Sequence, residues 1–177
     1  MSVNGKQKGA SFERAICKKL SLWLTNGQRS DVLWRSAMSG GRATVAHKKN
    51  DETHQSGGDL TGTDEAGFWL TSRFSIECKF YKEFSLDAWI YDRKQGIPEF
   101  WNQCRRDAKR SKKAPMLIAK KNQYPEILVF DSYGNGLLFS NMEVIDLVEH
   151  GLVGVFPKHD AYVFLLDKFL KNTRLFP

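Results

Sequence analysis

The sequence predicts a single α/β domain in which two amphipathic helices alternate with short strands. Residues 11–25 place apolar side chains at helical spacing, whereas residues 74–80 alternate apolar and polar side chains as a strand does. The apolar runs 115–119 and 126–131 indicate further, buried strands. With 177 residues, 41% of them hydrophobic, the chain is long enough to bury one core.

The charge of the chain favours an acidic partner. Its formal net charge is +7 and its pI about 9.3. Residues 1–50 hold ten lysines and arginines against two acids, whereas residues 122–177 hold four against seven. The positive field is therefore expected over the first two thirds of the chain.

Cysteine usage and apolar runs indicate a cytoplasmic protein. Cys17, Cys78 and Cys104 form neither a CxxC pair nor an even-numbered disulfide framework, which is typical of a reducing compartment. The N-terminus lacks the apolar core of a signal peptide, and no apolar run approaches the length of a membrane span. We expect no membrane partner and no small-molecule cofactor.

The first predicted helix, 11–25, ends at Asn26-Gly27, a typical C-terminal cap. Its buried stripe comprises Ile16, Cys17, Leu20 and Leu24. Glu13 extends this stripe, and a carboxylate there is paired, bound to a metal or at the edge of the core. An exposed glutamate that suits the helix dipole is the other interpretation.

A short strand at 31–36 is followed by a long polar segment, 37–58, with glycines at both ends. A loop of this length in a compact domain is usually functional or disordered. Its basic residues are candidates for phosphate contacts: Arg42, Lys48 and Lys49. His47 and His54 lack the spacing of a metal site and are interpreted as ordinary loop residues.

Asp59 and the strand 74–80 form the centre of the predicted site. A turn at 64–67 is expected to fold the segment from Asp59 back as a hairpin against this strand. Glu77 and Lys79 share one face, because alternate residues of a strand point the same way. Two close carboxylates raise each other's pKa unless a cation lies between them, and oxygen ligands suit a hard divalent cation. A plain salt bridge between Glu77 and Lys79 is the alternative.

A second helix is predicted at about 99–112, with Pro98 in its first turn. Its apolar face carries Phe100, Cys104 and Ala108. The other faces and the C-terminal end are basic and carry Arg105, Arg106, Lys109, Arg110, Lys112 and Lys113. A phosphate-contacting surface and a solvated helix with cations near its C-terminus are both consistent with this pattern.

No residue pattern in the last third of the chain suggests a catalytic or metal-binding site. A turn is predicted at 131–136 and a short helix at 142–149, capped by Asn141 and stopped by Gly151. The apolar tail, 162–170, is expected to dock on the core or on a second subunit.

The order of these elements resembles the PD-(D/E)XK nuclease superfamily, most closely its Holliday-junction-resolvase-like branch. The matching segments are 8–14 with Glu13, 35–41 with its Ser/Gly loop, Gly58-Asp59 at the "PD" position, and Glu77-Cys78-Lys79 at (D/E)XK. Gly58 replaces the proline of the motif. The resemblance implies one nuclease domain over 1–177. It has a restriction-endonuclease-like core at about 8–121, a mixed central sheet flanked by helices (αβββαβ), and a C-terminal α/β extension at about 122–177.

The resemblance also implies a Mg²⁺-dependent endodeoxyribonuclease, with Mn²⁺ able to substitute. The implied metal ligands are Asp59, Glu77 and the backbone carbonyl of Cys78, joined by Glu13 directly or through water. Such an ion activates water, neutralises charge at phosphorus and orients the substrate.

Lys79 and Ser39 complete the implied catalytic set of Glu13, Asp59, Glu77, Lys79 and Ser39. Lys79 is expected to orient the attacking water or to stabilise charge at phosphorus. Ser39 is expected to contact the scissile phosphate, unless it only fills the loop.

The implied partner is DNA, branched at a four-way junction and cut by a homodimer, in a bacterial or phage-infected cell. The residues expected to contact DNA are Arg14, Arg35, Arg42, Lys48, Lys49, Gln103, Arg106, Lys109, Arg110 and Lys113. Two other functions stay open at this point. One is a restriction- or recombination-associated nuclease on duplex or flap DNA, and the other a catalytically silent basic DNA-binding protein of the same fold.

Overall fold

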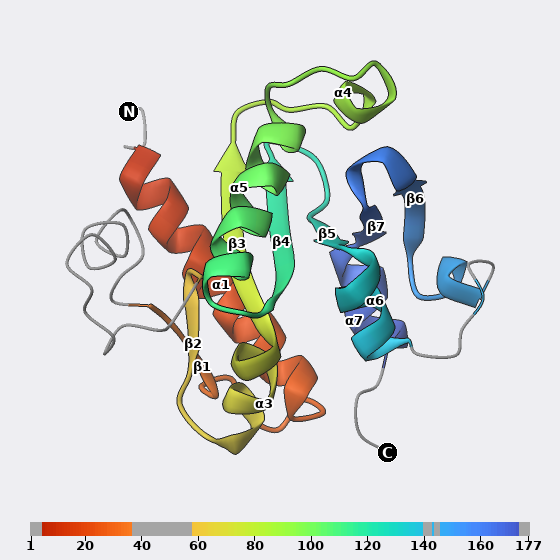
Figure 1. The fold of residues 1–177 in the computed structure, drawn as a ribbon. Helices are drawn as coiled ribbons and strands as arrows, with labels where there is room; N and C mark the ends of the chain where they lie inside the picture. The colour runs from red at the N-terminus through yellow and green to blue at the C-terminus, as the bar shows by residue number, and fades with distance from the viewer. Residues whose placement is uncertain (1–4, 37–57, 140–142, 144–145, 174–177) are drawn as a thin grey trace.

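The computed structural model describes residues 5–36, 58–139, 143 and 146–173, and its centre is a five-stranded mixed sheet (Figure 1). The strands lie in the order β3-β4-β5-β7-β6. β3 (Phe74–Tyr81) and β4 (Ala114–Lys121) are parallel. β5 (Ile127–Phe130), β7 (Ala161–Leu165) and β6 (Leu152–Phe156) continue the sheet in antiparallel pairs. The predicted α/β fold with a mixed sheet is confirmed.

A small antiparallel sheet of β1 (Leu33–Arg35) and β2 (Leu60–Gly62) extends the β3 edge. The strand predicted at 31–36 is thus confirmed in its centre. Gly58 forms a parallel bridge to Ile76 of β3, and the Asp59 amide donates to the Ile76 carbonyl at 2.7 Å. The two sheets therefore meet at Gly58 and Asp59.

The predicted hairpin is wrong, because the segment between β2 and β3 is helical. Asp64 is the N-cap of α3 (Glu65–Arg73), and its side chain accepts from the Gly67 amide at 3.2 Å. An acid at the cap and another in the first turn stabilise a helix start as well as a turn. The helix carries the chain back along the sheet, so β3 runs parallel to the segment at Gly58, as helical crossovers require.

Two apolar clusters cover the two faces of the sheet, because alternate strand residues point to opposite sides. Ile76 and Met116 pack with α1 (Gly5–Leu24), α3 and α7 (Leu166–Asn172) on one face. Leu117 and Val129 pack with α4 (Asp87–Ile90) and α5 (Ile97–Arg110) on the other. Figure 1 shows α5 in front of β3 and β4. The core thus holds β3 between α1 and α5.

Both predicted main helices are confirmed, although the first begins six residues and the second two residues before its predicted start. α1 begins at Gly5 and ends at Leu24, followed by Gly27 with a φ of 86°. α5 begins at Ile97, with Pro98 in its first turn. In the described part of the chain, no helix combines the length and apolar character needed to cross a membrane.

The C-terminal third differs from the prediction in two places. The turn expected at 131–136 is α6 (Ser132–Leu138), because the Asp131 carboxylate caps it by accepting from the Gly134 amide at 2.7 Å. The helix expected at 142–149 falls partly outside the described residues, and Asp146–Val148 form a 3-10 turn. The tail docks on the core, where Phe164 and Phe169 are fully buried.

The close contact of α3 with β1 and β2 depends on Gly67. A Cβ at Gly67 would overlap the Val32 carbonyl oxygen and lie 2.9 Å from the Gly62 Cα. We expect Gly67→Ala to lower the free energy of unfolding by about 2 kcal/mol or more, measured by urea denaturation. The reason is that the added methyl group would clash with backbone atoms, which cannot move aside as a flexible side chain can. Gly136→Ala is the matched control. It lies in α6 with open space around its Cβ and should raise stability by up to about 1 kcal/mol. A Gly67→Ala variant as stable as wild type would contradict this packing.

Candidate active site

The described acidic residues of the predicted site gather at the β3 edge of the main sheet. Glu77 and Lys79 lie on β3, Asp59 follows the bridge at Gly58, and Glu13 lies on α1. The charges of Glu13 and Glu77 both act on Asp59. The structure therefore brings these residues to the same edge of the sheet, through a parallel bridge instead of a hairpin.

Backbone hydrogen bonds fix Asp59 in place. Its amide donates to the Ile76 carbonyl, and its carbonyl accepts from the Ser36 amide at 2.7 Å. Its side-chain Oδ2 accepts from the Cys78 amide at 2.8 Å. Within the described residues, no donor contacts Asp59 Oδ1. One carboxylate oxygen is thus anchored, and the other is available to a ligand.

The pKa of Asp59 is raised from 3.8 to about 7. Burial is the main cause, and the neighbouring charge of Glu77 adds to it, while the hydrogen bond from the Cys78 amide opposes the shift. Glu13 also raises it and Lys79 lowers it. The site therefore holds more negative charge than its own cations neutralise.

Glu77 and Lys79 form a partly buried ion pair, with the ammonium donating to Oε1 of Glu77 at 2.7 Å. Burial raises the pKa of Glu77, and Lys79 opposes this. Burial also disfavours the charged ammonium, but Glu77 outweighs it and the pKa of Lys79 is raised. The salt bridge considered from the sequence exists, and it also leaves a protonated lysine beside both carboxylates.

Glu13 is buried and paired with Arg35, whose Nε donates to Glu13 Oε2. This excludes the interpretation of Glu13 as an exposed first-turn glutamate. Arg35 was expected to contact DNA, and that role stays a prediction. No pattern in the sequence indicated this pair, beyond the need of a buried carboxylate for a counter-charge.

The donor chemistry of the site fits a hard divalent cation. Asp59 and Glu77 offer carboxylate oxygens, and the raised pKa of Asp59 reflects desolvation and the charge of Glu77, both of which favour a bound cation beside it. Among the described residues, no group of three or more His, Cys, Asp or Glu side chains is already arranged around a common metal position. Asp59 and Glu77 are therefore the residues that would hold the ion, with Glu13 engaged by Arg35.

The Cys78 carbonyl as a metal ligand stays a prediction. The Cys78 amide holds Asp59, and its thiol is buried, which raises its pKa well above the usual value. Cys78 therefore takes part in the site through its backbone.

The residues predicted to contact DNA fall into four groups. Ser39 of the catalytic set and Arg42, Lys48 and Lys49 lie outside the described residues. With 3.6 residues per turn, Gln103 and Arg110 lie on one flank of α5 with Asp107. Lys109 and Lys113 lie toward the other flank and line a surface hollow, and Arg106, one helical turn before Arg110, lies between the two flanks and also lines it. Arg14 is exposed on α1, one residue from Glu13.

The flank of α5 that carries Asp107 faces the carboxylates. This orientation follows from the charge of Asp107, which raises the pKa of Glu77. Arg110 donates to Asp107 at 2.9 Å. Sequence reasoning missed Asp107 as a residue near the site, although its helical spacing from Gln103 would have indicated it.

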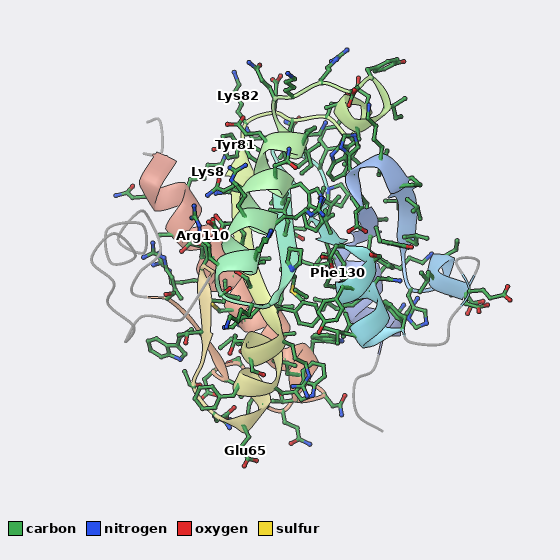
Figure 2. The ribbon with its side chains drawn as sticks, viewed as in Figure 1. Lys8, Glu65, Tyr81, Lys82, Arg110 and Phe130 are labelled. Carbon is green, nitrogen blue, oxygen red and sulfur yellow. The ribbon has the colours of Figure 1, made fainter. Side chains whose placement is uncertain are left out.

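Sequence reasoning also missed two cations on this side of the molecule, Lys8 and Lys82. In Figure 2, Lys8, Lys82 and Arg110 lie along the side of the molecule formed by α1 and β3, and Glu65 lies far from them. Lys8 lies over the Phe80 ring, 3.9 Å from its centroid, and donates to Asn122. These cations extend the positive surface along the edge that holds the carboxylates.

A mixed sheet with paired acids at its edge, and a lysine two residues after the second acid, defines a restriction-endonuclease-like fold with a PD-(D/E)XK site. The model of the family described as "Phage putative PDDEXK endonuclease" matches residues 4–147, and the chain belongs to this family. No curated protein and no solved structure matches the chain. The predicted superfamily is confirmed, and the matched segment extends beyond residue 121, where the resemblance was expected to end.

The raised pKa of Asp59 predicts a specific pH dependence of stability. The folded state binds the Asp59 proton more tightly than the unfolded state, so between about pH 4 and 7 Asp59 makes the metal-free protein less stable as pH rises, by at most about 1.4 kcal/mol per unit. Asp59→Asn removes this effect. In EDTA, its gain in unfolding free energy over wild type should be larger at pH 8 than at pH 5.

Glu65→Gln, an exposed first-turn acid of α3, is the control for this measurement and should show no such difference between the two pH values. A gain for Asp59→Asn that is equal at both pH values would contradict the assigned pKa.

Proposed function

We propose that this nuclease is a Mg²⁺-dependent DNA endonuclease that hydrolyses phosphodiester bonds, with Mn²⁺ able to replace Mg²⁺. The observation that carries the proposal is the pair of half-buried Asp59 and buried Glu77, in which Asp59 has a pKa of about 7 and Lys79 lies 2.7 Å from Glu77. A catalytically silent DNA-binding protein has no use for such a pair, since burying uncompensated carboxylates costs stability.

The divalent ion would supply Lewis acidity, an activated water and neutralisation of charge at phosphorus. Asp59 and Glu77 would hold it, and the Cys78 amide keeps the Asp59 carboxylate oriented. The protonated Lys79 is placed to donate hydrogen bonds to a phosphate oxygen or to the attacking water. Glu13 and Arg35 act as a pair at the α1 side of the site.

We further propose that the preferred substrate is branched DNA, a four-way junction, cut by a homodimer in a bacterial or phage-infected cell. The support is the resemblance of the motifs to the resolvase-like branch and the positive edge formed by Lys8, Lys82 and Arg110. The apolar tail that was a candidate for the subunit interface packs in the core through Phe164 and Phe169, so another surface would form the dimer.

A cleavage assay tests both levels of this proposal. The wild-type protein is incubated with a four-way junction, a flap, a nicked duplex and a linear duplex, with Mg²⁺, with Mn²⁺ and with EDTA. We expect cleavage only with the metals, and fastest on the junction. Asp59→Asn and Glu77→Gln should each lower the rate at least about 1,000-fold, because each removes a metal ligand. Both should still bind DNA in EDTA.

Glu65→Gln is the matched control, since it removes an equal charge far from the site (Figure 2). It should cut at the wild-type rate. Equal cleavage of linear and branched DNA would contradict the junction preference and favour the duplex or flap nuclease. Wild-type protein that cuts none of the four substrates would contradict the nuclease itself.

A further inference from the structure

An open hollow of about 470 Å³ lies on the flank of α5 that faces away from the carboxylates. It runs between α5, the start of β4 and the residue before α6, on the side of the sheet seen in Figure 1. Its lining residues are Asn102, Arg105, Arg106, Ala108, Lys109, Lys113, Pro115 and Asp131. The hollow is thus mainly basic.

Asp131, which lines the hollow, and Asp160, which pairs with its Arg105, are already engaged. Asp131 accepts from the Gly134 amide at 2.7 Å, and its pKa is raised by burial. Asp160 forms an ion pair with Arg105 at 3.6 Å and accepts from the Ser132 amide. Both carboxylates are thus satisfied by donors of the protein and do not neutralise the other cations of the hollow.

Three cations of the hollow stay without a counter-charge. Within the described residues, no acid pairs with Arg106, Lys109 or Lys113. Lys113 is half-buried, and burial alone lowers its pKa. A partly buried ammonium without a partner is unfavourable unless an anion fills the hollow.

We propose that this hollow binds the sugar-phosphate backbone of a DNA segment lying across α5 from the strand held at Asp59 and Glu77. The inference rests on the proposed function, because it takes the ligand to be the DNA substrate. It adds a second backbone-binding site that does not touch the carboxylates.

The spacing of the cations fits a backbone better than a single ion. Arg106 and Lys109 lie about 4.5 Å apart along the axis of α5, at a rise of 1.5 Å per helical residue, and Lys113 follows beyond the helix end at Arg110. Phosphates of one DNA strand advance about 3.4 Å per base pair along the duplex, so the three cations are spaced on the scale of successive phosphates. A helix is about 10–12 Å wide, close to the roughly 12 Å major groove, so one duplex can contact both flanks of α5.

The test compares two triple variants in the Asp59→Asn background, which binds but does not cut. The first carries Arg106→Gln, Lys109→Gln and Lys113→Gln. The second, the control, carries Lys158→Gln, Lys168→Gln and Lys171→Gln, an equal change of charge in the C-terminal part. Affinity for a duplex and for a junction is measured in EDTA over a range of salt concentrations.

We expect the hollow variant to bind at least about tenfold more weakly at low salt. The slope of log K against log salt should become shallower by about 2 to 3, since each lost phosphate contact contributes about 0.9. The control should match the parent. A hollow variant with the slope of the control overturns the inference. If Lys113→Gln unfolds the protein in a thermal melt, the double variant of the exposed Arg106 and Lys109 replaces it, with an expected change of about 2.

Wild-type cleavage measured in parallel separates this inference from the proposed function. If the wild type cuts no DNA but the hollow variant loses affinity, the nuclease fails and the second binding site stands. If the wild type cuts and the hollow variant binds like the control, only the second site fails.

The position of the bound segment is tested with a tethered cleavage reagent. Cys17, Cys78 and Cys104 are buried, so an iron chelate attaches selectively to an introduced surface cysteine. Lys109→Cys should cut the DNA backbone at nucleotides away from the bond that the enzyme cleaves, and Lys171→Cys should cut nothing. No cutting from position 109 overturns the inference.

Discussion

The parallel bridge between Gly58 and Ile76 determines how close Asp59 lies to Glu77. Gly58 has a φ of 109°, and a Cβ there would lie 2.6 Å from the Ile76 carbonyl oxygen, so the bridge admits glycine only. The next residue then donates its amide to Ile76 and accepts from the Cys78 amide through its side chain. The strand that carries Glu77 thus also orients the second carboxylate.

This placement leaves the site with a charge that the protein does not neutralise by itself. Lys79 forms an ion pair with Glu77, and Arg35 forms one with Glu13. Among the described residues, the Asp59 carboxylate has one hydrogen-bond donor, the Cys78 amide, and no ion pair. Burial and the charge of Glu77 consequently raise the pKa of Asp59 to about 7. A strongly shifted pKa of this kind is typical of functional sites, where a bound ligand neutralises charge that the fold leaves uncompensated.

The sequence allowed prediction of the parts that depend on local periodicity. Strand alternation placed Glu77 and Lys79 on one face, and helical spacing placed Glu13 in the buried stripe of α1. The route from Asp59 to β3 was not predictable in this way, because an acid-rich start followed by Gly67 suits a turn and a helix N-terminus alike. The pairing of Glu13 with Arg35 joins α1 to β1, and no local pattern encodes such a long-range contact. The two flanks of α5 follow from helical spacing, but their different surroundings come from the packing of α5 across β3 and β4.

The central claim is that Asp59 and Glu77 share a divalent cation. The most direct measurement is an anomalous difference map from crystals of the wild type and of Glu77→Gln grown with Mn²⁺. The claim predicts a peak in contact with Asp59 and Glu77 in the wild type, and a weak or absent peak in the variant. A wild-type protein that cuts DNA with Mn²⁺ but shows the ion bound elsewhere would contradict it.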